Sequence, residues 1–171
     1  MTAHQNEGLN HSGAHIIRAR APEITLHNTD HETFTLRVAP PEEVSSSWPK
    51  IREHLDRAIE YCGGDFDSDD ILRLVGERRA FIILMETGGE IVLAAACEIQ
   101  ELPKKRVMFV MALGGSGLDV LAMHFWSRIQ GIAAVLKVDA VRGAVRPSMQ
   151  RYYRRIAPDA VVAYTILERA V

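Results

Sequence analysis

Hydrophobic and polar residues alternate over Phe34–Val38, and three mostly apolar segments follow at Ala80–Met85, Ile91–Ile99 and Val107–Leu113. Alternation with a period of two predicts a half-buried strand, and short apolar runs between turn residues are typical of buried strands. Thr87–Gly88–Gly89 separates the first two apolar segments and has the composition of a hairpin turn. The three segments therefore predict an antiparallel meander at the centre of a sheet.

Apolar residues recur at helical spacing in two segments between the first strand and the meander, and in one long segment after it. We expect Ser45–Ser47 to cap the first helix, with Pro49 in its first turn, and Asp67 to cap the second. The long helix is predicted over Leu118–Lys137. The last predicted elements are a strand at Asp139–Gly143, a helix from Pro147 to Ile156 and a strand at Ala160–Arg169.

This order of elements predicts an α/β (α+β) fold, in which helices flank a mixed, mostly antiparallel central sheet. Residues 1–33 are polar and hold five of the seven histidines, so we expect an extended N-terminal arm before one domain at 34–171. Gly13 and Pro22 disfavour a long helix that would align these histidines, and no cysteine assists them. We therefore predict no metal site.

Composition excludes several classes of protein. The chain has 171 residues, 47% hydrophobic, with a net charge of −2, which argues against a dedicated nucleic-acid binder. Its longest uninterrupted apolar runs have seven residues, too few for a membrane-spanning helix, and no apolar signal core begins the chain. Cys62 and Cys97 form neither a disulfide framework nor a zinc cluster, so we expect two small buried residues in a reducing compartment.

The sharpest local chemistry lies between the last strand of the meander and the long helix. Here a buried strand leads into Gly114–Gly115–Ser116–Gly117, which starts the helix. Backbone N–H groups of such a turn, from Leu113 to Gly117, can bind a phosphate together with the helix dipole. A tight strand-to-helix turn that needs glycine for its backbone alone explains the same residues.

This element order resembles that of the GNAT superfamily of N-acetyltransferases. The resemblance implies that acetyl-CoA is the cofactor and that its pyrophosphate binds at Leu113–Gly117, where Gly115–Ser116–Gly117 matches the family's glycine pattern. The family's preceding Gln or Arg falls on Ala112 and is missing. Tyr153 matches the tyrosine that protonates the departing thiolate, and Glu98 matches an acid that can serve as base. Packing of Tyr153 on the sheet and a solvated Glu98 are the alternative interpretations.

Five arginines lie within fourteen residues near the end of the chain, and an arginine fork suits phosphate and carboxylate groups. Their candidate ligands are the 3′-phosphate of CoA, an acidic protein partner or DNA, and a solvated helix face is the alternative. They are Arg142, Arg146, Arg151, Arg154 and Arg155.

Trp48–Leu55, Cys62–Phe66 and Ala112–Gly115 resemble segments of GNAT-like proteins encoded in tailed-phage and prophage morphogenesis regions, some of them internal virion proteins. This narrower resemblance implies a role in virion assembly that requires no cofactor, in the virion and the bacterial host cytoplasm. The arm and the five arginines would then contact other virion or assembly proteins in a larger complex. We take assembly as the first hypothesis, an acetyl-CoA-dependent N-acetyltransferase as the alternative, and contact with DNA as a third.

Overall fold

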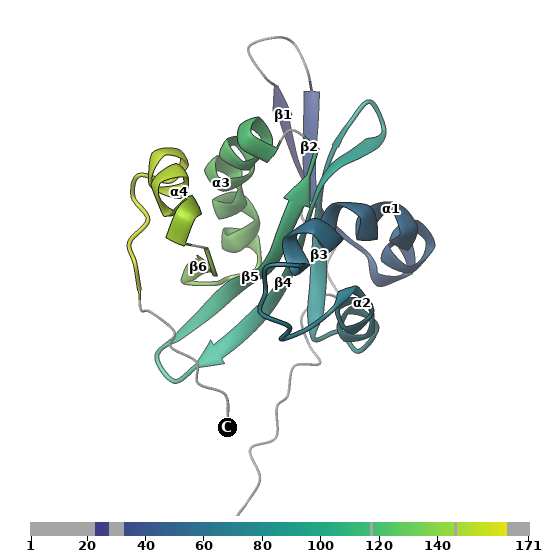
Figure 1. Ribbon diagram of the computed structural model, residues 1–171, viewed down its shortest axis with the longest axis horizontal. Coiled ribbons are helices and arrows are strands. Elements are labelled where there is room, and N and C mark those ends of the chain that lie inside the picture. Colours follow the sequence, from purple (N-terminus) through teal and green to yellow (C-terminus); the bar gives the residue numbers. More distant parts are fainter. Residues whose placement is uncertain (1–22, 28–32, 117, 146, 164–171) are drawn as a thin grey trace, which may run out of the picture.

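The computed structural model of the chain describes residues 23–27, 33–116, 118–145 and 147–163 (Figure 1). Its centre is a six-stranded sheet with the strands in sequence order. The strands are β1 (Glu23–His27), β2 (Thr33–Ala39), β3 (Ala80–Thr87), β4 (Glu90–Leu102), β5 (Lys105–Gly115) and β6 (Ala140–Gly143). The helices are α1 (Pro41–Ile59), α2 (Ser68–Gly76), α3 (Leu118–Val135), the 3₁₀ turn η1 (Pro147–Met149) and α4 (Gln150–Ile156).

The predicted meander is confirmed as β3, β4 and β5, which pair antiparallel. The β3–β4 turn places Gly88 at φ +57° and Gly89 at φ +82°, the left-handed region that a two-residue hairpin turn requires. Among the described strands, β6 alone pairs in parallel, with β5, along the edge of β5 that faces away from β4. The fold is therefore the mixed, mostly antiparallel α/β arrangement that the sequence predicts.

Each face of the sheet carries its own hydrophobic core, and helices cover both faces (Figure 1). The helices α1 and α2 contribute Val44, Trp48, Ile51, Leu55, Ile71 and Val75 to one core. The helix α3 contributes Phe125, Ile129, Ile132 and Ala133 to the other, whereas α4 packs against α3 and has no buried residue. Alternating side chains of β3 and β4 divide between the two cores, as strand geometry requires.

The first helix begins earlier than the sequence analysis expects. It starts at Pro41, so that Pro49 lies inside the helix and the hydroxyls of Ser45 and Ser46 donate to the carbonyls of Pro41 and Glu43. The caps assigned to Ser45–Ser47 were therefore wrong. Pro41 and Pro49 both suit the first position of a helix, where the missing N–H of proline costs nothing. The helix begins at Pro41, the earlier of the two.

Both ends of the described chain differ in detail from the predicted elements. β1 falls within residues 1–33, which were expected to form an extended arm, and it adds an antiparallel edge strand to β2. Residues 160–163, the start of the predicted last strand, have no regular secondary structure. Residues 1–22, 28–32 and 164–171 lie outside the described residues. Among the helices that are described, none is both long and apolar enough to cross a membrane.

Candidate functional site

The sheet opens between β5 and β6. The two strands pair in parallel from Val107–Ala140 to Val110–Gly143, where β6 ends. β5 continues through Gly115, and in the described residues its edge beyond Val110 pairs with no strand on that side. Backbone N–H and C=O groups along a free strand edge can hydrogen-bond an extended ligand.

A β-bulge sits at the point where the two strands part. Ala96 pairs with Ala112 and Cys97 with Val110, so Met111 is the extra residue of β5. Met111 and Ala112 both contact the core under α1 and α2, whereas Val110 and Leu113 contact the core under α3. A bulge bends a strand and increases its twist, which turns the end of β5 away from the direction of β6.

The glycines of the predicted phosphate turn have structural roles in β5. A Cβ on Gly114 would lie 1.7 Å from the carbonyl oxygen of His54, so glycine is required for α1 to lie directly on the strand. A Cβ on Gly115 would lie 2.4 Å from the carbonyl oxygen of Val92. The N–H of Ser116 already donates to that same carbonyl, at 3.0 Å.

These contacts correct the position of the predicted turn. Gly114 and Gly115 are the last residues of β5 rather than the first residues of a turn, and Leu113 packs partly against the core under α3. Gly117, the last candidate residue, lies outside the described residues. A role of the backbone from Leu113 to Ser116 in phosphate binding stays a prediction, and the start of α3 at Leu118 lies at the same end of β5.

An aromatic cluster lies on the α3 side of the opening. The indole of Trp126 meets the ring of Tyr153 edge to face, with centroids 6.1 Å apart, and the ring of Phe125 at 5.6 Å. A Cβ on Gly143 would lie 3.6 Å from Cη2 of Trp126 and 3.8 Å from Cβ of Val110. Trp126 therefore connects Tyr153, the predicted general acid, to the last paired residues of β5 and β6.

Glu98, the predicted base, lies on the opposite face of the sheet. Its neighbours Cys97 and Ile99 contact the core under α3, so the side chain of Glu98 points to the α1–α2 side. It is half-buried and accepts a hydrogen bond of 2.6 Å from Nε2 of Gln100. The register also places Glu98 beside Phe109, and Phe109 beside Arg142 on β6. The sheet thus separates Glu98 from Tyr153.

The predicted arginine cluster divides between two places. Arg142 lies on β6, half-buried, whereas Arg151, Arg154 and Arg155 are exposed on α4. Arg151 and Arg155 are each two residues from Tyr153, about 200° round the helix, so they project from its outer face. Arg155 lies over the ring of Tyr152, 5.6 Å from its centroid. Arg146 falls outside the described residues.

The two cysteines differ in environment. Cys97 is fully buried in the core under α3, and burial raises the pKa of its thiol far above the ordinary range. Cys62 follows α1, is half-buried and lies 3.9 Å from the carbonyl oxygen of Met111; burial raises its pKa as well. Both are free thiols that stay protonated at neutral pH, so neither is a nucleophile there.

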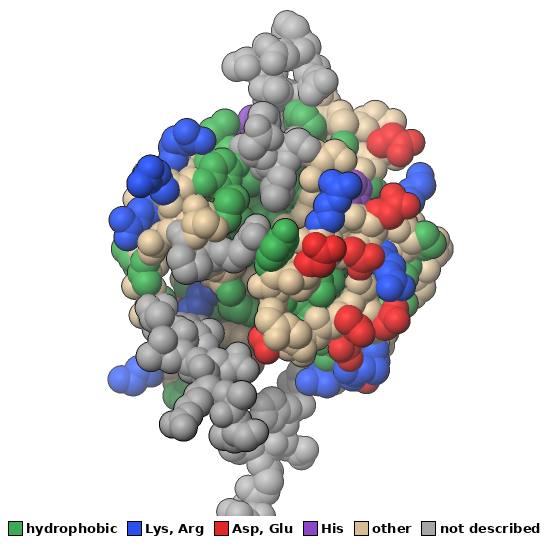
Figure 2. All heavy atoms as spheres, viewed as in Figure 1, with side chains coloured by type: hydrophobic (Ala, Val, Ile, Leu, Met, Phe, Trp, Pro, Cys, Tyr) green, Lys and Arg blue, Asp and Glu red, His purple; other side chains and the backbone are tan. Residues whose placement is uncertain are grey.

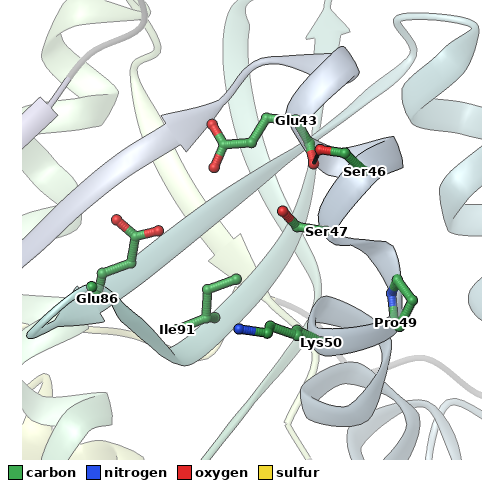
Figure 3. A pocket seen from close by; sticks show the side chains of 8 residues that line it. Glu43, Ser46, Ser47, Pro49, Lys50, Glu86 and Ile91 are labelled. Carbon is green, nitrogen blue, oxygen red and sulfur yellow. Dashed lines mark hydrogen bonds between the residues drawn. The ribbon is translucent and has the colours of Figure 1, made fainter.

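A surface cavity of about 470 Å³ lies between α1 and the β3–β4 hairpin (Figure 3). Beside it, Arg37 forms ion pairs with Glu43 at 2.5 Å and with Glu86 at 2.7 Å, which join β2, α1 and β3. No predicted site residue lines this cavity. Its lining residues are Glu43, Ser46, Ser47, Pro49, Lys50, Glu86, Gly89 and Ile91.

No protein-family model matches the chain, and no curated protein matches it in sequence. Solved acetyltransferases match it in structure over most of their own length. An aminoglycoside acetyltransferase from an uncultured soil metagenomic sample, solved with sisomicin, has a TM-score of 0.62 at 9% identity, covering 81% of this chain and 96% of that chain.

Two further structures extend this likeness. A GNAT family acetyltransferase from Staphylococcus aureus has a TM-score of 0.57 at 7% identity, covering 81% and 98% of the two chains. A predicted acetyltransferase from Clostridium acetobutylicum, solved with acetyl-CoA, has a TM-score of 0.55 at 14% identity, covering 79% and 96%. The fold of this chain is therefore that of the GNAT acetyltransferases, as the element order predicts.

Sequence reasoning missed three residues of the opening: Met111, Trp126 and Gly143. A bulge leaves no signal in an apolar strand, so nothing indicated Met111. Trp126 lies beside Phe125 in the apolar stripe of α3 and resembles an ordinary core residue. Gly143 at the end of a short predicted strand was a usable signal, because glycine there permits close approach by another group.

Proposed function

We propose that the chain is an acetyl-CoA-dependent N-acetyltransferase. The observation that carries this proposal is the free edge of β5 beyond Val110, which begins at the bulge and has Trp126 and Tyr153 on one side. An extended amide chain can pair with such an edge as an added strand would. The structural likeness to a protein solved with acetyl-CoA supports the same ligand.

Two features of the opening suit this cofactor. A Cβ at Gly143 would enter the space beside Val110 and Trp126, and glycine leaves that space free. The buried Nε1–H of Trp126 has no hydrogen-bond partner among the described residues, and amide or thioester carbonyls are acceptors. The free edge of β5 would hold the arm of acetyl-CoA, and the start of α3 would meet its pyrophosphate. When bound, acetyl-CoA supplies an acetyl group activated as a thioester.

Tyr153 and Glu98 have complementary roles in this proposal. The hydroxyl of Tyr153 donates a proton to the sulfur as the C–S bond breaks and the N–C bond of the product forms. The amine loses its own proton to Glu98, directly or through water. Because the two side chains lie on opposite faces of the sheet, the amine approaches from the α1–α2 side and the thiol leaves on the α3–α4 side.

The test compares two neighbouring tyrosines of α4. Titration calorimetry with acetyl-CoA is expected to give a measurable Kd, and free thiol release is measured with a polyamine, an amino acid and an aminoglycoside as acceptors. Tyr153→Phe is expected to lower turnover about 100-fold with Kd unchanged. Tyr152→Phe is the matched control and keeps turnover. No binding at millimolar acetyl-CoA would contradict the proposal.

We retain virion assembly as a second candidate, and the exposed arginines of α4 are the observation that favours it. In the part of the chain that is described, neither Arg151 nor Arg154 forms an ion pair with a carboxylate. Unpaired arginines on an outer surface suit an acidic protein partner, or DNA with a steep salt dependence. Mass spectrometry of purified phage particles and their assembly intermediates tests this role, and absence of the chain from both contradicts it.

A further inference from the structure

Trp126 carries a hydrogen-bond donor that takes no part in the proposed proton transfers. Its Nε1 is buried, and among the described residues no acceptor lies within reach. The indole is held on two sides by edge-to-face contacts with Phe125 and Tyr153, both at interplanar angles of 88°. The donor is therefore fixed in position by packing rather than by a hydrogen bond.

The position of the indole relates this donor to the opening. Its Cζ2 and Cη2 atoms form the ring edge nearest to Gly143, the residue at which β6 ends. Cζ2 and Nε1 are bonded to the same ring carbon, so the N–H lies next to this edge. The N–H of Trp126 therefore lies beside the point at which β5 and β6 part.

Trp48 provides the comparison within the same molecule. Its Nε1 is also buried without a partner in the described residues, but the side chain is 8% exposed inside the core of α1. It belongs to the core under α1 and α2, on the other face of the sheet from Trp126. A buried donor without an acceptor destabilises the fold wherever it lies, and of these two donors that of Trp126 lies beside the point at which β5 and β6 part.

We propose that Nε1–H of Trp126 donates a hydrogen bond to a carbonyl oxygen in the thioester-bearing arm of acetyl-CoA. This inference rests on the proposed function, because it assumes that the arm enters the opening. Trp126 is then a binding residue that favours a ligand with a hydrogen-bond acceptor at this position along the arm. The carbonyl is either the thioester or a neighbouring amide, since both present the same oxygen acceptor.

The first experiment uses Trp126→Phe, which keeps an aromatic ring but removes the donor. Titration calorimetry should show that Kd for acetyl-CoA rises about tenfold, the effect of losing one hydrogen bond. Trp48→Phe, the matched control, should leave Kd unchanged. Thermal melting of both variants shows that each is folded. An unchanged Kd for a folded Trp126→Phe overturns the inference.

A second measurement locates the hydrogen bond. Trp48→Phe leaves Trp126 as the single tryptophan of the chain. Its fluorescence should then change on titration with acetyl-CoA and saturate at the calorimetric Kd; no change at saturation contradicts contact. CoA lacks the thioester carbonyl but keeps the amides, so it distinguishes the two acceptors. If Trp126→Phe weakens the binding of acetyl-CoA but not of CoA, the acceptor is the thioester. If it weakens the binding of both ligands equally, the acceptor is an amide.

Failure of this inference is separable from failure of the proposed function. If Trp126→Phe binds and turns over acetyl-CoA like the wild type, the inference fails and the acetyltransferase proposal stands. If acetyl-CoA binds with the predicted dependence on Trp126 but no amine is acetylated, the inference stands and the proposed catalysis fails. If the wild-type chain does not bind acetyl-CoA, both fail.

Discussion

The helices on the two faces of the sheet are stabilised in different ways. Residues 41–79 of the α1–α2 layer carry ten acidic and six basic side chains, many of them in ion pairs, and a capping box closes α2. On the α3–α4 side, α4 has no buried residue, and the neighbouring edge strand β6 has only four residues. In Figure 2, acidic and basic groups mix over α1 and α2, whereas the groups over α4 are basic alone.

This difference indicates a division of roles between the two layers. In the α1–α2 layer, ion pairs join Arg52, Arg73 and Arg79 to neighbouring carboxylates, and α1 packs so closely on β5 that a Cβ on Gly114 would meet the backbone of His54. On the α3–α4 side, the edge of β5 beyond Val110 has no strand partner, and Arg151 and Arg154 have no carboxylate partner, among the described residues. Ligand sites are commonly drawn from the less stable parts of a fold. We therefore expect stability to depend on the first layer and ligand binding on the second.

The largest effect on stability is expected at Gly114. Gly114→Ala places a Cβ at 1.7 Å from backbone of α1, so the helix must move off the strand. We expect a loss of more than about 3 kcal/mol in the free energy of unfolding, measured by urea denaturation. Gly143→Ala, with its nearest contact at an ordinary 3.6 Å, should stay within about 0.5 kcal/mol of the wild type and weaken acetyl-CoA binding. Equal stability of the two variants would remove the distinction between the layers.

Arg37 is the next test of the α1–α2 layer. Arg37→Met leaves Glu43 and Glu86 half-buried without their shared cation, and the expected loss is about 2 kcal/mol, between the values for exposed and buried ion pairs. Arg154→Met on α4 is the matched change and should have no measurable effect. In a double-mutant cycle, Glu86→Gln should cost less in the Arg37→Met background than in the wild type. Additive losses would show that the pair contributes nothing.

A smaller effect is expected at the start of α2. The carboxylate of Asp67 accepts from the N–H of Asp70 at 2.8 Å, and the carboxylate of Asp70 accepts from the N–H of Asp67. Asp67→Ala removes the cap and should cost about 1 kcal/mol by thermal or urea unfolding. Asp67→Asn, which keeps an acceptor oxygen, should recover most of it. A similar loss in both variants would show that the charge, rather than the hydrogen bond, stabilises the helix.

The smallest expected effect is a pH dependence from the surface of α2. A hydrogen bond from Arg73 lowers the pKa of Asp70, and hydrogen bonds from Arg79 and Arg73 lower the pKa of Glu77. Because the folded-state pKa values are lowered, this stabilisation is present at neutral pH and is lost as the pH falls below about 4. The urea midpoint of Arg73→Gln should lie below that of the wild type at pH 7 and approach it at pH 3. An equal gap at both pH values contradicts the assignment.

The sequence predicts the sheet well because apolar strands and glycine turns are marked by residues that are close together in the chain. The meander follows from three apolar segments and from Gly88–Gly89, and the cap of α2 follows from Asp67 and Asp70. The start of α1 was missed because Pro41 and Pro49 both satisfy the rule for a first helical residue. Only packing against the sheet, through Val44 and Trp48, decides between them.

The candidate site was harder to predict because it depends on contacts between distant segments. Tyr153 lies beside the opening because its ring packs against Trp126, and no local sequence pattern indicates a contact between α3 and α4. Gly114 looked like part of a phosphate loop, but its conformation and packing belong to β5 and α1. Glu98 was correctly placed on a central strand, but its separation from Tyr153 follows only from strand register.

Amide hydrogen exchange with and without acetyl-CoA tests the central claim that the ligand binds in the α3–α4 half. Saturating acetyl-CoA is expected to slow exchange in Met111–Gly115, β6 and α4, while exchange in α1 and α2 is unchanged. Protection confined to α1 and the β3–β4 hairpin, or no protection at a concentration that saturates binding, would contradict it.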